Sequence, residues 1–390
     1  MFTNQSVNLD VLRARAYNLR WATVSEDIIP LTAADPDFPV AEPIREALIR
    51  YTKDGYFSYG PAEGLSSFRE SLAKRYFEKR GVDYDPSCIV AVDSAAAGIH
   101  LVCKTFLEKG DEAIIFDPVD FLFKYSIESI QAVAIPFATP QSNYPIDFSS
   151  LEMQISPRTK MICLCNPLNP TGKVFTKKEL RQLALIAEKH NLIILSDEIW
   201  SDIVFKPHTY TSIASIDEAI KNRTIIVTGF SKSYGLASLR VGAIMAPTVD
   251  LYKKIYASSL HNSTISGCNV PGQIAATAAM DSCDQWLADF VTHLQEMRDN
   301  TTEKINGIPG LQCIAPEGCY VAWVDIRGTG LSSAEMQTLL MDKAKVSVVP
   351  GLSQWFGAGA EGYIRISFAT SSHILNKALD QIHSTLTTQL

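Results

Sequence analysis

One stretch decides the fold, and it reads Thr224-Ile225-Ile226-Val227-Thr228-Gly229-Phe230-Ser231-Lys232-Ser233-Tyr234-Gly235-Leu236-Ala237-Ser238-Leu239-Arg240-Val241-Gly242. Its branched apolar residues predict a short buried strand, and the polar residues that follow predict a turn interrupted by glycine. Lys232 lies in this turn between two serines. A lysine at the edge of an apolar core loses hydration, which favours a neutral amine that can form a Schiff base with a carbonyl. Taken alone, Lys232 is more typical of a solvated loop, so its interpretation depends on two other stretches.

Two other apolar runs also end in polar residues. One is Cys163-Leu164-Cys165-Asn166-Pro167-Leu168-Asn169-Pro170-Thr171-Gly172, in which rigid Asn-Pro pairs can aim an amide side chain. The other is Asn191-Leu192-Ile193-Ile194-Leu195-Ser196-Asp197-Glu198-Ile199-Trp200, in which Asp197 lies just beyond the apolar run, where open α/β sheets bind their ligands. An asparagine, an aspartate, a lysine and an arginine at such positions suit pyridoxal phosphate. This cofactor needs a donor for its phenolic oxygen, a carboxylate for its ring nitrogen, an amine for its aldehyde and cations for its phosphate.

These motifs give the chain a resemblance to a known family. Asn-Pro-x-Asn-Pro-Thr-Gly, Ser-Asp-Glu-Ile and Ser-Lys-x-x-Gly-Leu-x-x-x-Arg resemble the class I/II aminotransferases, which are pyridoxal-phosphate enzymes of fold type I. The resemblance covers nearly the whole chain. It implies that Lys232 is the Schiff-base lysine and that Asp197 pairs with the pyridinium nitrogen. It also implies that Asn169 binds the phenolic oxygen, that Arg240 binds the phosphate, and that Ser231 is among the residues that bind the cofactor.

Further cofactor contacts implied by the resemblance depart in part from the family pattern. Ala95 and Ala96 lie in a strand-to-helix turn where most relatives have Gly-x-Ser/Thr, but their backbone amides can still bind a phosphate. We expect the helix that follows to span Ile99–Glu108. Trp200 stands where relatives usually carry a tyrosine or histidine against the phenolic oxygen, and Tyr59 matches a tyrosine that reaches the phosphate of the neighbouring subunit. Packing within their own chain is the alternative role for both aromatic residues.

The clearest departure from the family pattern is Asp120, which stands where relatives usually have an aromatic residue stacked on the cofactor ring. An anion against the face of the ring would need hydrogen bonds of its own. We therefore expect Asp120 to point away from the ring or to bond the nearby backbone, while Phe121 or Phe123 covers the ring.

The substrate contacts are also implied by the resemblance. Arg365 lies on the apolar run Gly362–Phe368, where an unpaired cation would be costly to bury. Guanidinium binds carboxylate bidentately, and the position of Arg365 matches the family's substrate-carboxylate arginine. Ala34 lies in a segment that corresponds to the one that lies over the substrate carboxylate in the family. Asn169 is the third residue that the resemblance implies for substrate binding. A structural salt bridge is the alternative role for Arg365.

Composition limits the class of protein. The 390 residues have a net charge of −7, are 46% hydrophobic and 20% charged, and so suit a globular protein and argue against nucleic acid or an anionic membrane as partner. The eight cysteines lack metal-ligand spacing, so we expect buried free thiols and no metal site. The N-terminus is polar and no run approaches the ~20 apolar residues that span a bilayer, so we expect a cytoplasmic protein.

The predicted fold is α/β, with a large domain over residues 48–282 built on a mostly parallel, seven-stranded-type sheet flanked by helices. A smaller α+β domain would combine residues 1–47 with 283–390, and a short helix is expected around Leu9–Leu19. By the resemblance, we expect a homodimer with active sites that share residues across the interface.

The function we predict is pyridoxal-phosphate-dependent transfer of an amino group between an L-amino acid and a 2-oxo acid, through a Schiff base at Lys232. A carbon–sulfur β-lyase of the cystathionine-lyase-like branch is the alternative, because Ala33-Ala34-Asp35-Pro36-Asp37-Phe38-Pro39 looks somewhat like that branch. A regulatory module that binds the cofactor would need an additional effector or DNA-binding domain, for which the chain has little room.

Overall fold

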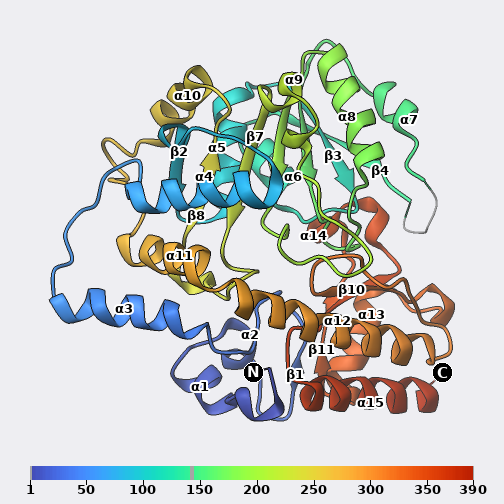
Figure 1. Ribbon diagram of the computed structural model, residues 1–390. Coiled ribbons are helices and arrows are strands. Elements are labelled where there is room, and N and C mark those ends of the chain that lie inside the picture. The colour runs from blue at the N-terminus through green and yellow to red at the C-terminus, as the bar shows by residue number, and fades with distance from the viewer. Residues whose placement is uncertain (1, 141–144, 390) are drawn as a thin grey trace.

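The computed structural model describes residues 2–140 and 145–389, and its largest element is a seven-stranded sheet (Figure 1). Only β8 runs antiparallel to its neighbours in this sheet; the other paired strands are parallel. The predicted α/β fold with a mostly parallel sheet is therefore confirmed. In spatial order the strands are β2 (Ile89–Val92), β8 (Gly242–Met245), β7 (Thr224–Gly229), β6 (Ile193–Asp197), β5 (Thr159–Cys165), β3 (Glu112–Asp117) and β4 (Val133–Ala138).

Helices cover the sheet, which explains why its strands are near-continuous apolar runs. All of β7 is buried, as expected of a parallel strand with both faces covered. Between β5 and β6 lies α8 (Lys177–Lys189), which begins with a capping box formed by Thr176 and Glu179. The other helices associated with this part of the chain are α4 (Ser66–Arg80), α5 (Ala95–Phe106), α6 (Leu122–Glu128), α7 (Phe148–Glu152), α9 (Glu218–Lys221), α10 (Val249–Ser259) and α11 (Val270–Ser282).

A four-stranded antiparallel sheet forms the second layer of strands, in the order β12-β13-β10-β9. The long helix α12 (Asp284–Asn306) leads from the first sheet into this region (Figure 1). The strands of the four-stranded sheet are β9 (Gln312–Cys313), β10 (Val321–Asp325), β12 (Val349–Pro350) and β13 (Tyr363–Ser367). The other helices of this region are α13 (Ser333–Leu339), α14 (Ser353–Phe356) and α15 (Ser372–Gln389).

The N-terminal segment lies against the C-terminal region, because β1 (Ile29–Pro30) pairs in parallel with β11 (Val346–Ser347) (Figure 1). The single helix expected around Leu9–Leu19 is wrong. The structure has two short helices, α1 (Leu9–Ala14) and α2 (Leu19–Ala22), before α3 (Glu42–Asp54). Tyr17 breaks the run with a φ of 50°, and the Asn18 side chain caps α2.

The start of α5 also differs from the prediction, because this helix begins at Ala95 and not at Ile99. Ser94 is its N-cap, and the Ser94 side chain accepts a hydrogen bond from the Ala97 backbone amide at 3.0 Å. The alanines that we interpreted as a turn therefore form the first turn of the helix.

The sheet register brings three polar segments to one edge. Cys165 is opposite Asp197, and Asp197 is opposite Val227, so β5 and β6 end at the same level and β7 ends two residues further on, at Gly229. The loop that carries Asn169, the carboxylate of Asp197 and the turn that carries Lys232 therefore meet at the carboxyl ends of parallel strands, where α/β sheets bind ligands.

Candidate active site

Lys232 lies in the turn after β7 with its amine held inside the protein. Its Nζ atom donates a hydrogen bond to the backbone carbonyl oxygen of Ala34 at 2.7 Å and lies 5.3 Å from the ring centre of Trp200. Burial lowers the pKa of Lys232, Arg365 acts in the same direction, and Asp35 opposes both. A partly buried lysine with a lowered pKa is suited to reaction as a neutral amine.

Asp197 ends β6 with a buried carboxylate that is 7% exposed. Its Oδ1 atom accepts a hydrogen bond from the Ile199 backbone amide at 3.1 Å. Burial raises the pKa of Asp197 to about 7, and Asp120 and Glu198 add to this effect. A protonated pyridine nitrogen would supply the positive partner that such a carboxylate needs, so this site fits the ring of pyridoxal phosphate.

Asn169 and Arg365 lie together, and Asp120 is the third member of their cluster. The Asn169 Oδ1 atom accepts from Arg365 Nη1 at 3.0 Å, and Asn169 Nδ2 donates to Asp120 Oδ2 at 2.9 Å. Arg365 lies on β13 and is 7% exposed, and burial lowers its pKa. Three segments far apart in the sequence thus form one polar cluster beside Lys232.

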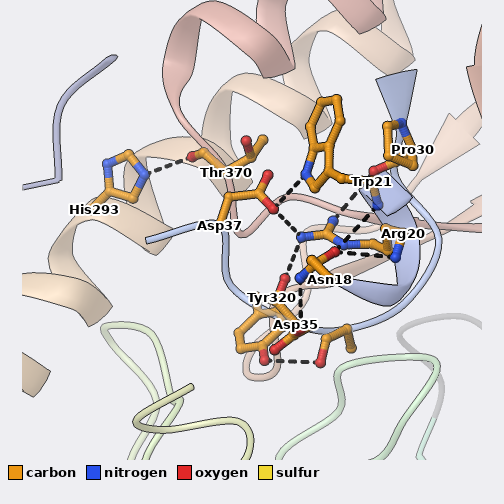
Figure 2. A network of polar contacts seen from close by, with 10 residues as sticks. Asn18, Arg20, Trp21, Pro30, Asp35, Asp37, His293, Tyr320 and Thr370 are labelled. Atoms are coloured by element: carbon orange, nitrogen blue, oxygen red, sulfur yellow. Dashed lines mark hydrogen bonds and ion pairs between the residues drawn. The ribbon is translucent and has the colours of Figure 1, made fainter. Parts of the chain in front are cut away.

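The segment that contains Ala34 also contains Asp37, which forms a buried ion pair with Arg20 (Figure 2). Arg20 Nη2 lies 2.7 Å from Asp37 Oδ1, and Trp21 Nε1 donates to the same oxygen at 2.7 Å. The Tyr320 hydroxyl donates to the Ala34 carbonyl oxygen at 3.1 Å. We refer to Arg20, Trp21 and Asp37 as the N-terminal clasp.

The clasp and Tyr320 were not predicted from the sequence. One signal was available, since Asp37 stands beside Phe38 in this segment, and an acid that is buried there requires a partner. The partners themselves lie in α2, which sequence analysis did not resolve as a separate helix.

Two of the residues expected to bind phosphate lie in the first turn of α5. Ala95 and Ala96 are the first residues of this helix, so their backbone amides are available to an anion there. Arg240 is exposed, with a φ of 46°, and its carbonyl oxygen accepts from Asn269 Nδ2 at 2.8 Å. Two residues further on, a Cβ on Gly242 would lie 2.9 Å from the Ala95 nitrogen, so this segment contacts the start of the helix.

The predicted aromatic contacts are distributed differently. Trp200 is 2% exposed and packs edge-on against Tyr320, with ring centres 4.6 Å apart. Phe123 is 2% exposed in the core, whereas Phe121 packs edge-on against Trp355 at 5.3 Å. Tyr59 is 92% exposed and lies on the surface of this chain.

Asp120 bonds the nearby backbone, as expected, because its Oδ1 atom accepts from the Leu122 amide at 3.4 Å. The contact between Asp120 and Asn169 was not expected. Among the described residues, no group of three or more His, Cys, Asp or Glu side chains could hold a metal ion, and no helix is long and apolar enough to cross a bilayer.

The fold and the site define a pyridoxal-phosphate enzyme of fold type I. The chain belongs to the family described as aminotransferase class I and II, whose model matches residues 26–382. It is therefore a pyridoxal-phosphate-dependent aminotransferase.

Individual relatives agree with this assignment. The chain is similar to an aspartate aminotransferase of Pyrococcus horikoshii, with 32% identity over 370 residues, which is 94% of this chain and 92% of that enzyme. The solved structure of an aromatic aminotransferase from Pyrococcus horikoshii aligns with a TM-score of 0.87 and 28% identity, over 95% of this chain and 98% of that one.

A third comparison concerns the fold alone. Cystalysin from Treponema denticola, whose structure contains pyridoxal 5'-phosphate, aligns with a TM-score of 0.91 over 100% of this chain and 99% of that one, at 23% identity. The family match and the named aminotransferases support transamination and give no support to the carbon–sulfur lyase alternative.

Proposed function

We propose that Lys232, Asp197, Asn169 and Arg365 form the reaction centre for amino transfer between an L-amino acid and a 2-oxo acid. The single observation that carries this proposal is the environment of Lys232. Its amine is held by the uncharged Ala34 carbonyl oxygen and has a lowered pKa. A lysine with these properties can both attack a carbonyl and move a proton.

The proposed roles follow from the chemistry of each group. Pyridoxal phosphate, when bound, supplies the aldehyde and an electron-accepting ring. Lys232 would hold the aldehyde carbon and then carry the α-proton at Nζ, and Asp197 would keep the ring nitrogen protonated. Arg365 would bind the substrate α-carboxylate, with Ala34 beside it, and Asn169 would donate to the phenolic oxygen.

The phosphate would be held at the start of α5. In this proposal the amides of Ala95 and Ala96, the Ser231 hydroxyl and the Arg240 guanidinium supply donors and positive charge. The contact between the Gly242 segment and Ala95 supports the idea that these groups act together. Trp200 would lie beneath the lysine, and Phe121 would cover the ring from the side of Trp355.

We also propose a homodimer in which Tyr59 reaches the phosphate of the partner subunit. The exposed aromatic residues of the segment before α4 support this proposal. Tyr56, Phe57 and Tyr59 are 79%, 67% and 92% exposed, and a row of exposed aromatic side chains is typical of an interface.

The proposal includes two domains, residues 48–282 and residues 1–47 with 283–390, although the boundary after residue 47 falls within α3 and must move to one end of that helix. The seven-stranded sheet uses only residues 89–245 and the four-stranded sheet only residues 312–367, which supports this division. A cytoplasmic location is also proposed, because all eight cysteines are buried free thiols, which are typical of a reducing compartment.

The test is covalent labelling of the holoenzyme. Borohydride reduction followed by peptide mapping should leave the pyridoxyl group on Lys232, and Lys232→Ala should lose the label. The same preparation, screened with a panel of amino acids, should convert the absorbance of the bound cofactor to that of its amine form. A label on another lysine would overturn the assignment of Lys232, and failure of every amino acid would overturn the proposed reaction.

A further inference from the structure

Asp120 has a position in the site that amino transfer, as described above, does not use. Its carboxylate accepts from Asn169 Nδ2 at 2.9 Å and, more weakly, from the Leu122 amide at 3.4 Å. The Asp120 Oδ2 atom lies 3.9 Å from Arg365 Nη1, and 24% of the Asp120 side chain is exposed to solvent. The Asp120 side chain is therefore only partly buried, and it lies beside the guanidinium that we propose for the substrate carboxylate.

The orientation of Asn169 is set by this arrangement. An amide can satisfy a carboxylate only with its nitrogen and a guanidinium only with its oxygen. Because Asn169 donates to Asp120 and accepts from Arg365, the amide connects an anion to a cation and keeps them at a fixed separation.

The separation of Asp120 from Arg365 is too long for a hydrogen bond. Arg365 is buried, with only 7% of its surface exposed, and its Nε atom has no hydrogen-bond partner among the described residues. A cation and an anion held a few ångströms apart, each with unused bonding capacity, are complementary to a molecule that carries both charges on neighbouring atoms. An amino-acid zwitterion is such a molecule, since its carboxylate and its ammonium group are attached to one carbon.

We propose that Asp120 binds the ammonium group of the incoming amino acid while Arg365 holds its α-carboxylate, and that Asp120 takes one proton from this group. This inference rests on the proposed function of Arg365. In the step, one N–H bond of the ammonium group breaks and an O–H bond forms on the Asp120 carboxylate. The amine left behind has the free electron pair that it needs to attack a carbon, and no oxidant or further reactant takes part.

The electrostatics of the site support this step. Burial raises the pKa of Asp120, which makes the carboxylate a better proton acceptor, while Arg365 opposes the rise and keeps the anion available. Lys232 is also close enough to lower the pKa of Asp120, so the amine that must be displaced and the proposed base lie in one site.

The rival explanation is that Asp120 only positions Asn169 and Arg365. The two explanations differ in the ligands that Asp120 affects. A positioning residue would affect every carboxylate that Arg365 binds, whereas an ammonium receptor would affect amino acids and spare 2-oxo acids and simple carboxylic acids, which have no ammonium group.

The test uses borohydride-reduced holoenzyme, in which Lys232 is fixed and amino acids can bind only without covalent reaction. Calorimetry would compare two ligand pairs that differ mainly in the amino group, namely L-aspartate with succinate and L-phenylalanine with 3-phenylpropanoate. In the unmodified sequence the amino acid of the better-binding pair should bind about tenfold or more tightly than its partner, because a charge-assisted hydrogen bond is added. Asp120→Asn should remove this advantage and leave the affinity for the plain carboxylic acid equal or higher.

Retained binding of the carboxylic acid also shows that the variant is folded with its site intact. Asp281→Asn, which changes an exposed acid on α11, is the matched control and should alter neither affinity. Equal weakening of both ligands in Asp120→Asn, or no weakening of either, would overturn the inference.

A kinetic measurement separates binding from proton transfer. In Asp120→Asn, kcat/KM for the amino acid should fall roughly 100-fold near pH 7, and the loss should shrink as the pH rises and the amino acid becomes a free amine that needs no base. Asp120→Glu should recover part of the loss, because it restores a carboxylate. If Lys232 carries no label after reduction, the proposed function fails; if it is labelled and the loss in Asp120→Asn is the same at every pH, only the role of Asp120 fails.

Discussion

Lys232 Nζ and the Ala34 carbonyl oxygen are 2.7 Å apart, which joins the turn after β7 to the segment that follows β1. The same carbonyl oxygen accepts from the Tyr320 hydroxyl at 3.1 Å, so Ala34 receives two donors from distant parts of the chain. A carbonyl can hold the amine without neutralising or protonating it. The position of the lysine therefore depends on whatever fixes the Ala34 segment, which is the N-terminal clasp.

The first prediction concerns this clasp. Asp37→Ala leaves the buried Arg20 without its ion-pair partner, and removing one member of such a pair typically costs about 3–5 kcal/mol. We expect a loss of this size in urea unfolding, together with a lower kcat, since Ala34 loses its support. Arg20→Met combined with Asp37→Leu removes both charges and should recover much of the stability. Full turnover in Asp37→Ala, despite lost stability, would show that the clasp does not position Lys232.

The second prediction concerns pH and Asp197. Burial raises the pKa of this carboxyl from its ordinary 3.8 to about 7, so the folded protein without cofactor binds its proton more tightly than the unfolded chain does. The protonated carboxyl makes its full contribution to the free energy of unfolding below about pH 4, and this contribution is lost as the pH rises towards 7. Asp197→Asn removes this dependence, so the cofactor-free variant should gain on the unmodified protein by up to about 4 kcal/mol between pH 4 and pH 8.

Urea unfolding of both cofactor-free proteins at pH 5 and pH 8 measures this difference. With cofactor bound, the ring nitrogen can pair with the carboxylate, so the advantage of the asparagine variant should disappear. The same pH dependence in both cofactor-free proteins would contradict the buried acid as its source.

The sequence predicted the parts of the site that lie at the ends of apolar strands. Asp197 and Lys232 follow runs whose burial is decided locally, and parallel strands bring their carboxyl ends together. The relation of Asp120 to Asn169 and Arg365 could not be predicted, because Asn169 is separated from them by 49 and 196 residues. Local patterns give no information about which side chains meet across two sheets.

The N-terminal clasp was missed for a related reason. Arg20 and Asp37 are charged residues that usually face solvent, and their burial follows from the packing of α2 against the Ala34 segment. The strands of the seven-stranded sheet, by contrast, were predictable, because near-continuous hydrophobic runs indicate strands that are buried on both faces of a sheet. Sequence therefore predicted the strands and the residues attached to them, and tertiary packing decided the rest.

The third prediction tests the proposed role of Tyr59 in the partner subunit. Tyr59→Ala and Lys232→Ala should each be weakly active or inactive alone, and mixing them should restore activity. A mixed dimer contains one site that has both residues, so up to about a quarter of full activity is expected from random pairing. Light scattering must show a dimer and differently tagged subunits must show exchange. No recovery after proven exchange would mean that Tyr59 serves its own chain.

The last prediction concerns Gly242, which lies on β8 between β2 and β7. A Cβ at this position would lie 2.8 Å from the Ser94 carbonyl carbon and the Thr228 oxygen, and 2.9 Å from the Ala95 nitrogen. All three atoms belong to the backbone, so Gly242→Ala must displace either the strand or the start of α5. Overpacking of this kind typically costs about 1–3 kcal/mol, which urea unfolding would detect.

The same displacement moves the amides of Ala95 and Ala96 that we propose for the phosphate. Gly242→Ala should therefore weaken the binding of pyridoxal phosphate by roughly tenfold or more, measured by titrating the cofactor-free protein and following its absorbance. Gly307→Ala is the matched control, because a Cβ there would meet its nearest neighbour at an ordinary 3.4 Å at the end of α12. If Gly242→Ala loses stability but binds the cofactor as tightly as the control, then the first turn of α5 does not hold the phosphate, and Arg240 and Ser231 must do so without it.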